Sequence, residues 1–391
     1  MISKIQMLSD ICSFADGRVA VAALDLDTYI STENMLPNKE GITRSAGLPT
    51  INQTQAYQTD DVLISNIRPY FKKIWCADRD GGCSNDVLVM RAKEGCDPGF
   101  LYYLLSDDNF FDYAMATAKG TKMPRGDKSA IMRYEVPDLP IDVQIGISDT
   151  LSVLDSRIAT NKAINNHLEQ MAQAIFKSWF VDFEPFGGEQ PANWAIGTIS
   201  DISADIVCGK TPSTKVAEYF GEDIPFITIP DMHSIVYVTS TERSLSTAGA
   251  ESQRGKTVPP NSICVSCIAT AGLVALTSVP SQTNQQINTI VCKDGISPYF
   301  VYLTMVGMAE HIKMLGSSGS ATSNLNKGQF SKIELVIPEN SDIKEFAALV
   351  EPLFKAIKAN QQENALLAGT RDALLPRLMS GELSVADVNT K

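Results

Sequence analysis

The stretch that decides the fold is ISDTLSVLDSRIATNKAINNHLEQMAQAIFKSW, at residues 147–179. Its seam positions advance by alternating steps of four and three residues, a heptad pattern typical of a helix that packs along another helix. The pattern recurs 199 residues later, in FAALVEPLFKAIKANQQENALLAGTRDALLPRL at residues 346–378. At 1.5 Å per residue, each copy predicts a helix of roughly 30 to 40 residues, about 45 to 60 Å long. We therefore expect two copies of one long helix.

Both copies carry a pair of asparagines in the middle of the seam, Asn161 and Asn165 in the first and Asn360 and Asn364 in the second. In an antiparallel pair, Asn161 falls opposite Asn364 and Asn165 opposite Asn360, so polar seam residues meet polar ones. A buried Asn costs stability but selects one register. The alternative is that each helix packs on its own domain and the Asn side chains face water. The residues expected to pair the helices are Leu154, Ile158, Asn161, Asn165, Leu168, Leu353, Ile357, Asn360, Asn364 and Leu367.

Two positions depart from the pattern. Ala172 of the first seam is replaced by Arg371 in the second. Pro352 lies inside the second seam, where a proline is expected to kink or restart the helix. Phe346 and Val350 would then belong to a separate short segment.

The stretches that precede the helices repeat more weakly. Both read as strand, strand, helix, polar loop and strand, followed by the long helix, which predicts mixed α/β domains. The matching pairs are DVLISNIRPYF (61–71) with SICVSCIATAG (262–272), SNDVLVMRA (84–92) with QQINTIVCK (285–293), and DPGFLYYLL (97–105) with SPYFVYLTM (297–305). The expected organisation is a first domain at 1–140, a first spacer helix at 141–186, a second domain at 187–338, and a second spacer helix with a tail at 339–391.

The composition bounds the function. The formal net charge of -12 argues against a protein that coats nucleic acid by bulk attraction, because such binding requires Lys and Arg to neutralise phosphates. Local patches or a partner would have to supply positive charge at any DNA contact. The sequence shows neither a signal peptide nor a bilayer-spanning stretch, and its eight cysteines fit reduced thiols, so we expect a cytoplasmic protein without a membrane partner.

Motifs that would carry catalysis are missing. Gly209-Lys210-Thr211 resembles the end of a phosphate-binding loop, but Ala204 stands where the earlier glycine is required and Pro212 follows where a helix should continue. No signature of a methyltransferase, kinase, deaminase or metalloprotease is found. Cys264 and Cys267 form one CxxC without a second pair, and we expect buried strand thiols there. The sequence therefore predicts no catalytic residue, no metal and no cofactor on this chain.

Cationic and polar loops remain as candidate DNA contacts. Arg or Lys can read guanine, Asn or Gln adenine, and Ser or Thr either base, while backbone contacts hold the register. Solvated surface is the alternative for each residue taken alone. The candidates in the first domain are Arg68, Tyr70, Lys72, Lys73, Lys119, Thr121, Lys122, Arg125 and Lys128. Those in the second are Lys210, Thr211, Ser213, Gln285, Gln286, Ser318, Asn324, Asn326 and Lys327.

Along nearly its full length the chain resembles the specificity subunit of type I restriction-modification enzymes. The segments that carry the resemblance are ISNIRPYFKKIW, GGCSNDVLV and KGTKMPRGDK in the first domain, DISADIVCGKTPST and IPFITIPD in the second, and the two long helices. The resemblance implies two target-recognition domains separated by an antiparallel helix pair. Each domain would read one half of a split, asymmetric site in double-stranded DNA, and the helices would set the distance between the halves.

The resemblance also implies partners. Two modification subunits, which carry S-adenosylmethionine and the methylation chemistry, would dock on the helices, and restriction subunits would join the larger complex. Two other classes stay open: a coiled-coil scaffold that binds only protein, and a nuclease or methyltransferase with unrecognised motifs. Activity of the isolated chain would distinguish the enzyme, and DNA binding would distinguish the scaffold.

Overall fold

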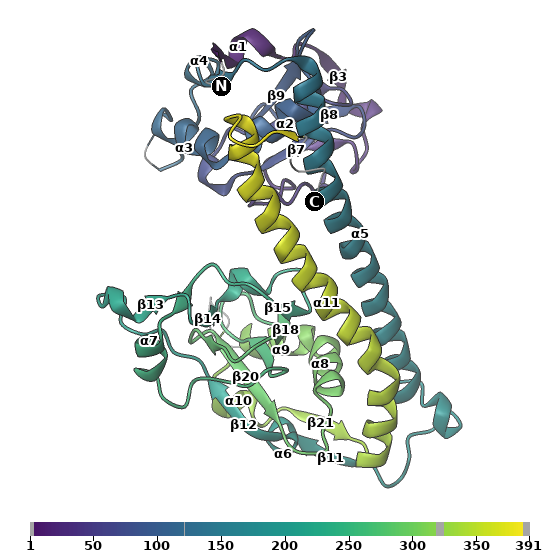
Figure 1. The fold of residues 1–391 in the computed structure, drawn as a ribbon. Coiled ribbons are helices and arrows are strands. Elements are labelled where there is room, and N and C mark those ends of the chain that lie inside the picture. The colour runs from purple at the N-terminus through teal and green to yellow at the C-terminus, as the bar shows by residue number, and fades with distance from the viewer. Residues whose placement is uncertain (1–3, 121, 318–323, 386–391) are drawn as a thin grey trace. The chain divides into compact units, whose positions relative to one another are not determined.

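The computed structural model describes residues 4–120, 122–317 and 324–385, which form two compact units. Unit 1 consists of Met1–Arg157 and Leu367–Lys391, and unit 2 of Ile158–Leu366. Each unit has its own sheets and includes part of two long helices, α5 (Ile141–Phe180) and α11 (Asn340–Met379) (Figure 1). The prediction of two mixed α/β domains and two long helices is therefore confirmed.

Unit 1 is built on a four-stranded antiparallel sheet in the order β2-β9-β6-β7. Its central strand reads VLIS with all four residues buried, a run typical of a strand covered on both faces. The four strands are β2 (Cys12–Phe14), β9 (Val87–Ala92), β6 (Val62–Ser65) and β7 (Ile74–Cys76). A second sheet contains β3 (Arg18–Ala20), β5 (Gln53–Tyr57), β8 (Gly81–Cys83) and β4 (Tyr29–Ile30), and β1 (Ile5–Met7) pairs with β10 (Glu135–Pro137). The helices are α1 (Leu8–Ile11), α2 (Pro98–Ser106), α3 (Asp108–Ala116) and α4 (Lys128–Ile131).

Unit 2 repeats this arrangement in the sheet β12-β20-β17-β18-β15. Its central strand reads ICVS and is again fully buried. The strands are β12 (Ser203–Cys208), β20 (Ile287–Cys292), β17 (Ile263–Ser266), β18 (Val274–Thr277) and β15 (Tyr237–Val238). A second sheet holds β13 (Phe220–Gly221), β16 (Ser244–Leu245), β14 (Ile224–Ile227) and β19 (Gln282–Thr283), and β11 (Ala195–Thr198) pairs with β21 (Glu334–Ile337). The helices are α6 (Ile199–Ile202), α7 (Thr247–Glu251), α8 (Pro298–Gly307), α9 (Ala309–Ser317) and α10 (Lys327–Phe330).

The covering helices of the two units, α2 and α8, begin in the same way. Each has proline at its first position, where the missing N–H costs no helical hydrogen bond. Asp97 caps α2 by accepting a hydrogen bond from the Phe100 N–H at 2.8 Å, and Ser297 caps α8 by accepting one from Tyr299 at 3.2 Å. The weak sequence repeat therefore reflects one topology used twice.

In unit 2, α5 and α11 run antiparallel with their asparagines in contact. Asn161 Nδ2 donates to Asn364 Oδ1 at 3.0 Å, and Asn360 Nδ2 donates to Asn165 Oδ1 at 2.8 Å. Asn161 is only 1% exposed, so the alternative of water-facing asparagines does not hold there. This is the register that the heptad pattern predicts. Ile357 is buried, and Leu168 and Leu353 pack against the same core at their margins.

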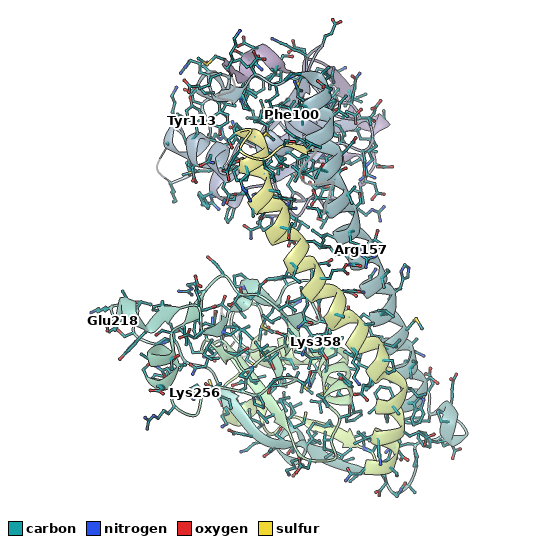
Figure 2. All side chains as sticks on the ribbon, viewed as in Figure 1. Phe100, Tyr113, Arg157, Glu218, Lys256 and Lys358 are labelled. Atoms are coloured by element: carbon teal, nitrogen blue, oxygen red, sulfur yellow. The ribbon has the colours of Figure 1, made fainter. Side chains whose placement is uncertain are left out.

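In unit 1, the other ends of the two helices share a core with the sheet β2-β9-β6-β7. Ile147 and Leu151 of α5 and Leu375 and Leu378 of α11 are all buried in it. Leu154 and Leu367 are half-buried, as is Ile158 at the start of unit 2. Figure 2 shows Phe100 of α2 within the same unit, where it is 1% exposed.

The expected break at Pro352 is wrong. α11 is one α-helix from Asn340 to Met379, and Pro352 lies exposed within it. Phe346 and Val350 before the proline and Phe354 after it are completely buried in the core of unit 2. Apolar burial on both sides therefore holds the helix together where one backbone hydrogen bond is lost.

Candidate nucleic-acid interface

Three segments of unit 1 converge where β6 ends. The Asn66 N–H donates to the Asp86 carbonyl at 2.8 Å, and the Arg68 N–H donates to the Pro124 carbonyl at 2.8 Å. Lys119 and Arg125, which flank the polar loop, exchange two backbone hydrogen bonds. The tertiary structure thus brings the predicted loop 67–73 and the described part of loop 119–128 onto one surface.

The same junction is present in unit 2. The Cys267 N–H donates to the Gln286 carbonyl at 2.8 Å, and the Leu325 N–H donates to the Cys267 carbonyl at 3.0 Å. In each unit the residue that leaves the central strand region has a left-handed backbone, with φ of 52° at Arg68 and 64° at Ala269. This conformation is uncommon outside glycine, so the matching turns are a specific shared feature. The convergent segments of the two units are called loop surface 1 (66–73, 84–86, 119–120 and 122–128) and loop surface 2 (208–213, 267–269, 284–286 and 324–327).

Most cations of loop surface 1 are already paired. Lys119 Nζ lies 2.5 Å from Asp127, and the hydrogen bond from Lys119 lowers the pKa of that carboxyl. Arg125 lies 3.0 Å from Asp86, an acid that the sequence interpretation did not include. Lys128 Nζ stands 5.4 Å from the centre of the Phe14 ring, within cation–π range.

The segment from Arg68 to Lys73 has a mixed environment. Lys72 lies 2.9 Å from Asp108. Lys73 Nζ donates to the Thr32 carbonyl at 2.7 Å, and burial lowers the pKa of Lys73. Tyr70 is 48% exposed beside Phe71, with ring centroids 4.6 Å apart, and so offers a flat aromatic surface to a ligand.

Arg68 and Lys122 form no ion pair within the described residues. The Nε atom of Arg68 is buried and has no hydrogen-bond partner there, and the same is true of the Asn66 Oδ1 atom. A guanidinium without an internal acid retains its charge for an external one. Arg68 is half-buried and Lys122 is exposed, so both side chains of loop surface 1 keep their charge without an acid among the described residues. Thr121 lies outside the described residues, as does Ser318 of the second domain.

In loop surface 2, amides and hydroxyls take the place of cations. Lys210 donates its N–H to the Thr283 carbonyl at 2.9 Å, and Thr211 Oγ1 donates to Gln285 Oε1 at 2.7 Å. A Cβ at Gly209 would lie 2.1 Å from the Asn284 carbonyl oxygen, so this close approach requires glycine. The Gly-Lys-Thr sequence is thus a strand-to-loop junction, and the structure agrees with its rejection as a phosphate-binding loop.

The remaining candidates of loop surface 2 divide by whether they are already bonded. Asn326 caps α10 by accepting from the Gln329 N–H at 3.0 Å. Gln286 Oε1 accepts from Asn284 Nδ2 at 3.0 Å, and Lys327 lies 3.7 Å from Asp205. Ser213 and Asn324 are exposed. Figure 2 shows Lys256 in the same unit, where its Nζ donates to the Cys208 carbonyl at 2.8 Å and so anchors the start of the 208–213 loop.

A surface groove next to Lys128 adds residues that the sequence interpretation missed. It has a volume of about 190 Å³ and is lined by Phe14, Ala15, Asp16, Gly17, Arg18, Gln55, Leu88, Val89 and Lys128. Arg18 and Gln55 face each other across β3 and β5. No local signal could have found them, because they join Lys128 only through the packing of two sheets.

The cysteines and potential metal ligands of the described part of the chain bear on whether it could support catalysis. No cluster of three or more His, Cys, Asp or Glu with metal-binding geometry occurs there. Burial raises the pKa of Cys12 and of Cys264 to about 12, so these thiols stay protonated at neutral pH. Cys264 and Cys267 are completely buried, as the sequence predicts. No helix among the described residues has the length and apolar character to cross a bilayer.

Two units of one topology, each presenting a convergent loop surface and each packed on the same pair of long helices, define a duplicated recognition protein. The comparisons place it more narrowly. The family model described as type I restriction modification DNA specificity domain matches residues 7–170 and 191–368. The chain therefore belongs to the family of type I restriction-modification specificity subunits, the non-catalytic DNA-recognition components of these systems.

Individual relatives agree with this assignment. The HindI specificity subunit of Haemophilus influenzae is 34% identical, over 97% of this chain and 99% of that protein. The MjaIX specificity subunit of Methanocaldococcus jannaschii is 25% identical, over 76% of this chain and 71% of that protein. The crystal structure of a type I restriction-modification S subunit from M. genitalium has a TM-score of 0.55 at 16% identity, with 96% of each chain covered, which shows similarity of fold.

Proposed function

We propose that this chain reads a bipartite, asymmetric site in double-stranded DNA, with loop surface 1 on one half and loop surface 2 on the other. The observation that carries the proposal is the repeated junction, in which three loop segments meet beside a left-handed residue in both units. The two surfaces have a similar backbone arrangement but different side chains, as expected for a split site whose two halves differ in sequence. The cationic side chains of loop surface 1 and the amide side chains of loop surface 2 are both of types that form hydrogen bonds with base edges.

The helix pair is proposed as the spacer between the half-sites. Each of the helices is 40 residues long, or about 60 Å at 1.5 Å per residue. The paired asparagines disfavour slippage of one helix along the other, because a shift would bury each amide against an apolar side chain. A single register is what a fixed spacing requires.

Two modification subunits are proposed to dock on the outer faces of the helices and to bring S-adenosylmethionine and the methylation chemistry; restriction subunits would join them. Exposed apolar side chains support this proposal: Ile164 and Met171, seven residues apart on α5 of unit 2, are 42% and 52% exposed. Partners would also supply phosphate contacts that a chain of net charge -12 lacks. The proposal places the chain in the cytoplasm together with the DNA that it reads.

Methylome sequencing of cells with and without this gene tests the proposal. We expect one split adenine-methylated motif that disappears when the gene is deleted and returns when it is restored. An unchanged methylome would contradict DNA reading and favour the protein scaffold. Replacing Ile164 and Met171 with serine should reduce co-purification of the modification subunit, whereas Val279→Ser, at a residue 41% exposed in a loop of unit 2, is the matched control.

A further inference from the structure

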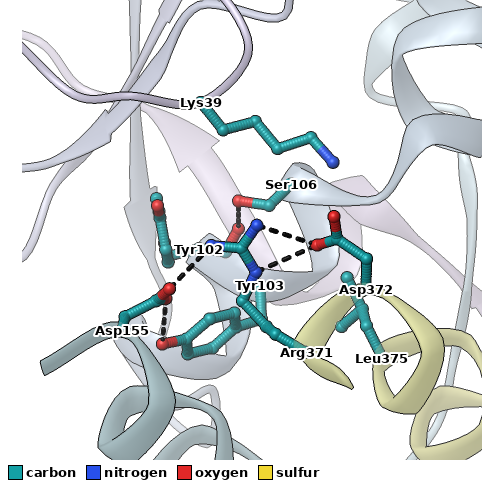
Figure 3. A pocket seen from close by; sticks show the side chains of 8 residues that line it. All are labelled: Lys39, Tyr102, Tyr103, Ser106, Asp155, Arg371, Asp372 and Leu375. Carbon is teal, nitrogen blue, oxygen red and sulfur yellow. Dashed lines mark hydrogen bonds and ion pairs between the residues drawn. The ribbon is translucent and has the colours of Figure 1, made fainter. Parts of the chain in front are cut away.

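A partly buried polar junction joins three elements of unit 1. Arg371 of α11 donates from Nη1 to Asp155 Oδ1 of α5 at 2.6 Å. The Tyr103 hydroxyl of α2 donates to the other oxygen of Asp155 at 2.8 Å. Figure 3 shows these contacts together with Asp372, which also pairs with Arg371, at 2.8 Å. One carboxylate thus binds a side chain from the other long helix and one from the recognition domain.

The junction is largely shielded from water. The side chains of Arg371 and Asp155 are 18% and 29% exposed, and Tyr103 is 4% exposed. Burial would lower the pKa of Arg371, but the Asp155 carboxylate raises it above its ordinary value. Burial and Asp155 raise the pKa of Tyr103, so its hydroxyl remains a donor. The cavity beside the cluster, about 10 Å³, is at the lower limit for one water molecule, which excludes a ligand site.

The repeat shows that this polarity is specific to one end of the helix pair. The residue of unit 2 that corresponds to Arg371 is Ala172, and the residue that corresponds to Asp155 is Phe354. Both are completely buried in an apolar core. At this layer of the helix pair, unit 1 therefore has the charged pair Asp155 and Arg371 where unit 2 has the apolar pair Phe354 and Ala172. Apolar packing is often as stable as a buried ion pair or more stable, so the charges need another explanation.

The position of the junction along the helices indicates how the charged residues contribute to the attachment of the domain. Toward the end of unit 1, Ile147 and Leu151 of α5 are covered by the core of the domain. Beyond Leu151 the seam is only half-buried at Leu154. The Asp155 cluster lies beyond these apolar contacts and ties the recognition domain to both helices. Directional bonds resist rotation and sliding more than apolar contacts do, because they weaken steeply with angle.

We propose that Asp155, Arg371 and Tyr103 are positioning residues that hold the first recognition domain at one angle on the helix pair and thereby enforce a single spacer length between the half-sites. The proposal rests on the proposed function. Without the junction, the domain keeps its loop surface and its base preference but can tilt on its apolar contacts. The half-sites then stay the same, while sites with a spacer one base pair shorter or longer become substrates.

Methylome sequencing of cells that carry chromosomal variants tests this. Arg371→Leu removes both ion pairs, and Tyr103→Phe removes only the hydroxyl and leaves the ring in place. Lys355→Gln is the control, because it removes an exposed pair with Glu351 at 2.9 Å on the same helix, in unit 2. In both test variants we expect the methylated fraction at sites of altered spacer to rise roughly tenfold, the change that corresponds to about 1.4 kcal/mol. The control should match the wild type, and Arg371→Lys should restore part of the discrimination.

The outcomes separate the two proposals. Absence of any split motif in the wild type would refute the proposed function and this inference with it. An intact motif with strict spacing in Tyr103→Phe would overturn the inference alone, even if Arg371→Leu fails to fold. Altered half-site sequences at constant spacing would also overturn it, since they would make the junction part of base reading.

Discussion

Lengthening the helix pair by one heptad gives the sharpest test of the spacer. The contacts between Asn161 and Asn364 and between Asp155 and Arg371 define the layers, so an insertion must be made at matching points of both helices. Duplicating Leu151–Arg157 in α5 and 368–374 in α11 does this and also duplicates the Asp155 layer. Seven residues at 1.5 Å add about 10.5 Å. At about 3.4 Å per base pair along the duplex, this corresponds to about three base pairs.

We therefore expect the methylated motif to keep both half-sites and to gain about three base pairs of spacer. Three base pairs also turn the second half-site by about 100° around the DNA axis, because B-DNA has about 10.5 base pairs per turn. A heptad rotates a helix seam by only about 20°. The lengthened site should consequently be methylated more weakly than the natural one.

Methylome sequencing of cells that express the lengthened chain measures the spacer directly. Duplication in α5 alone is the control, because it shifts Asn161 away from Asn364 and should abolish the motif instead of moving it. Altered half-sites at the original spacing would refute the view that these helices act as a ruler.

Three further predictions concern single positions. Arg68→Ala should weaken binding of the assembled complex to its DNA by about 1–3 kcal/mol but leave the melting temperature of the protein unchanged, since the Arg68 guanidinium has no ion-pair partner in the described residues. An electrophoretic titration measures the affinity and thermal melting the stability, and full DNA affinity of the variant would exclude Arg68 as a contact. Gly209→Ala should destabilise unit 2 by about 1–3 kcal/mol in a denaturant titration, because the added Cβ meets the Asn284 carbonyl. Gly307→Ala is the control and should be neutral, since a Cβ there would have no atom within 4 Å; equal stability of the two variants would contradict the packing argument. The double change Asn161→Leu and Asn364→Leu should raise the stability measured by calorimetry by about 1 kcal/mol, since Asn161 Oδ1 is buried without a partner among the described residues. The same change should broaden the range of spacer lengths in the methylome, and unchanged spacing would contradict the role of the asparagines in fixing the register.

The site was predictable in part. Loops 67–73 and 119–128 could be recognised in the sequence from their cations and turn residues. The sequence did not show which of these cations remain free of an internal partner and so available to DNA. Lys72 is paired with Asp108 and Arg125 with Asp86, and these acids lie on other segments that only tertiary packing brings near. The replacement of Ala172 by Arg371 was visible as a departure from the repeat. Its reason, a carboxylate and a tyrosine from two other elements, was not.

The sequence by itself determined the helix pair, its register and the duplication of the α/β unit. Periodicity carries this information, because heptad spacing and the central asparagines depend only on which side chains must be buried together. The break expected at Pro352 was wrong for a related reason: local propensity predicts a kink, but burial of Phe346, Val350 and Phe354 outweighs the loss of one hydrogen bond. Only the tertiary structure decided which loops share a surface, that Arg68 meets no acid among the described residues, and that Asp155 joins three elements. Such contacts join residues far apart in the chain, and no sequence period links them.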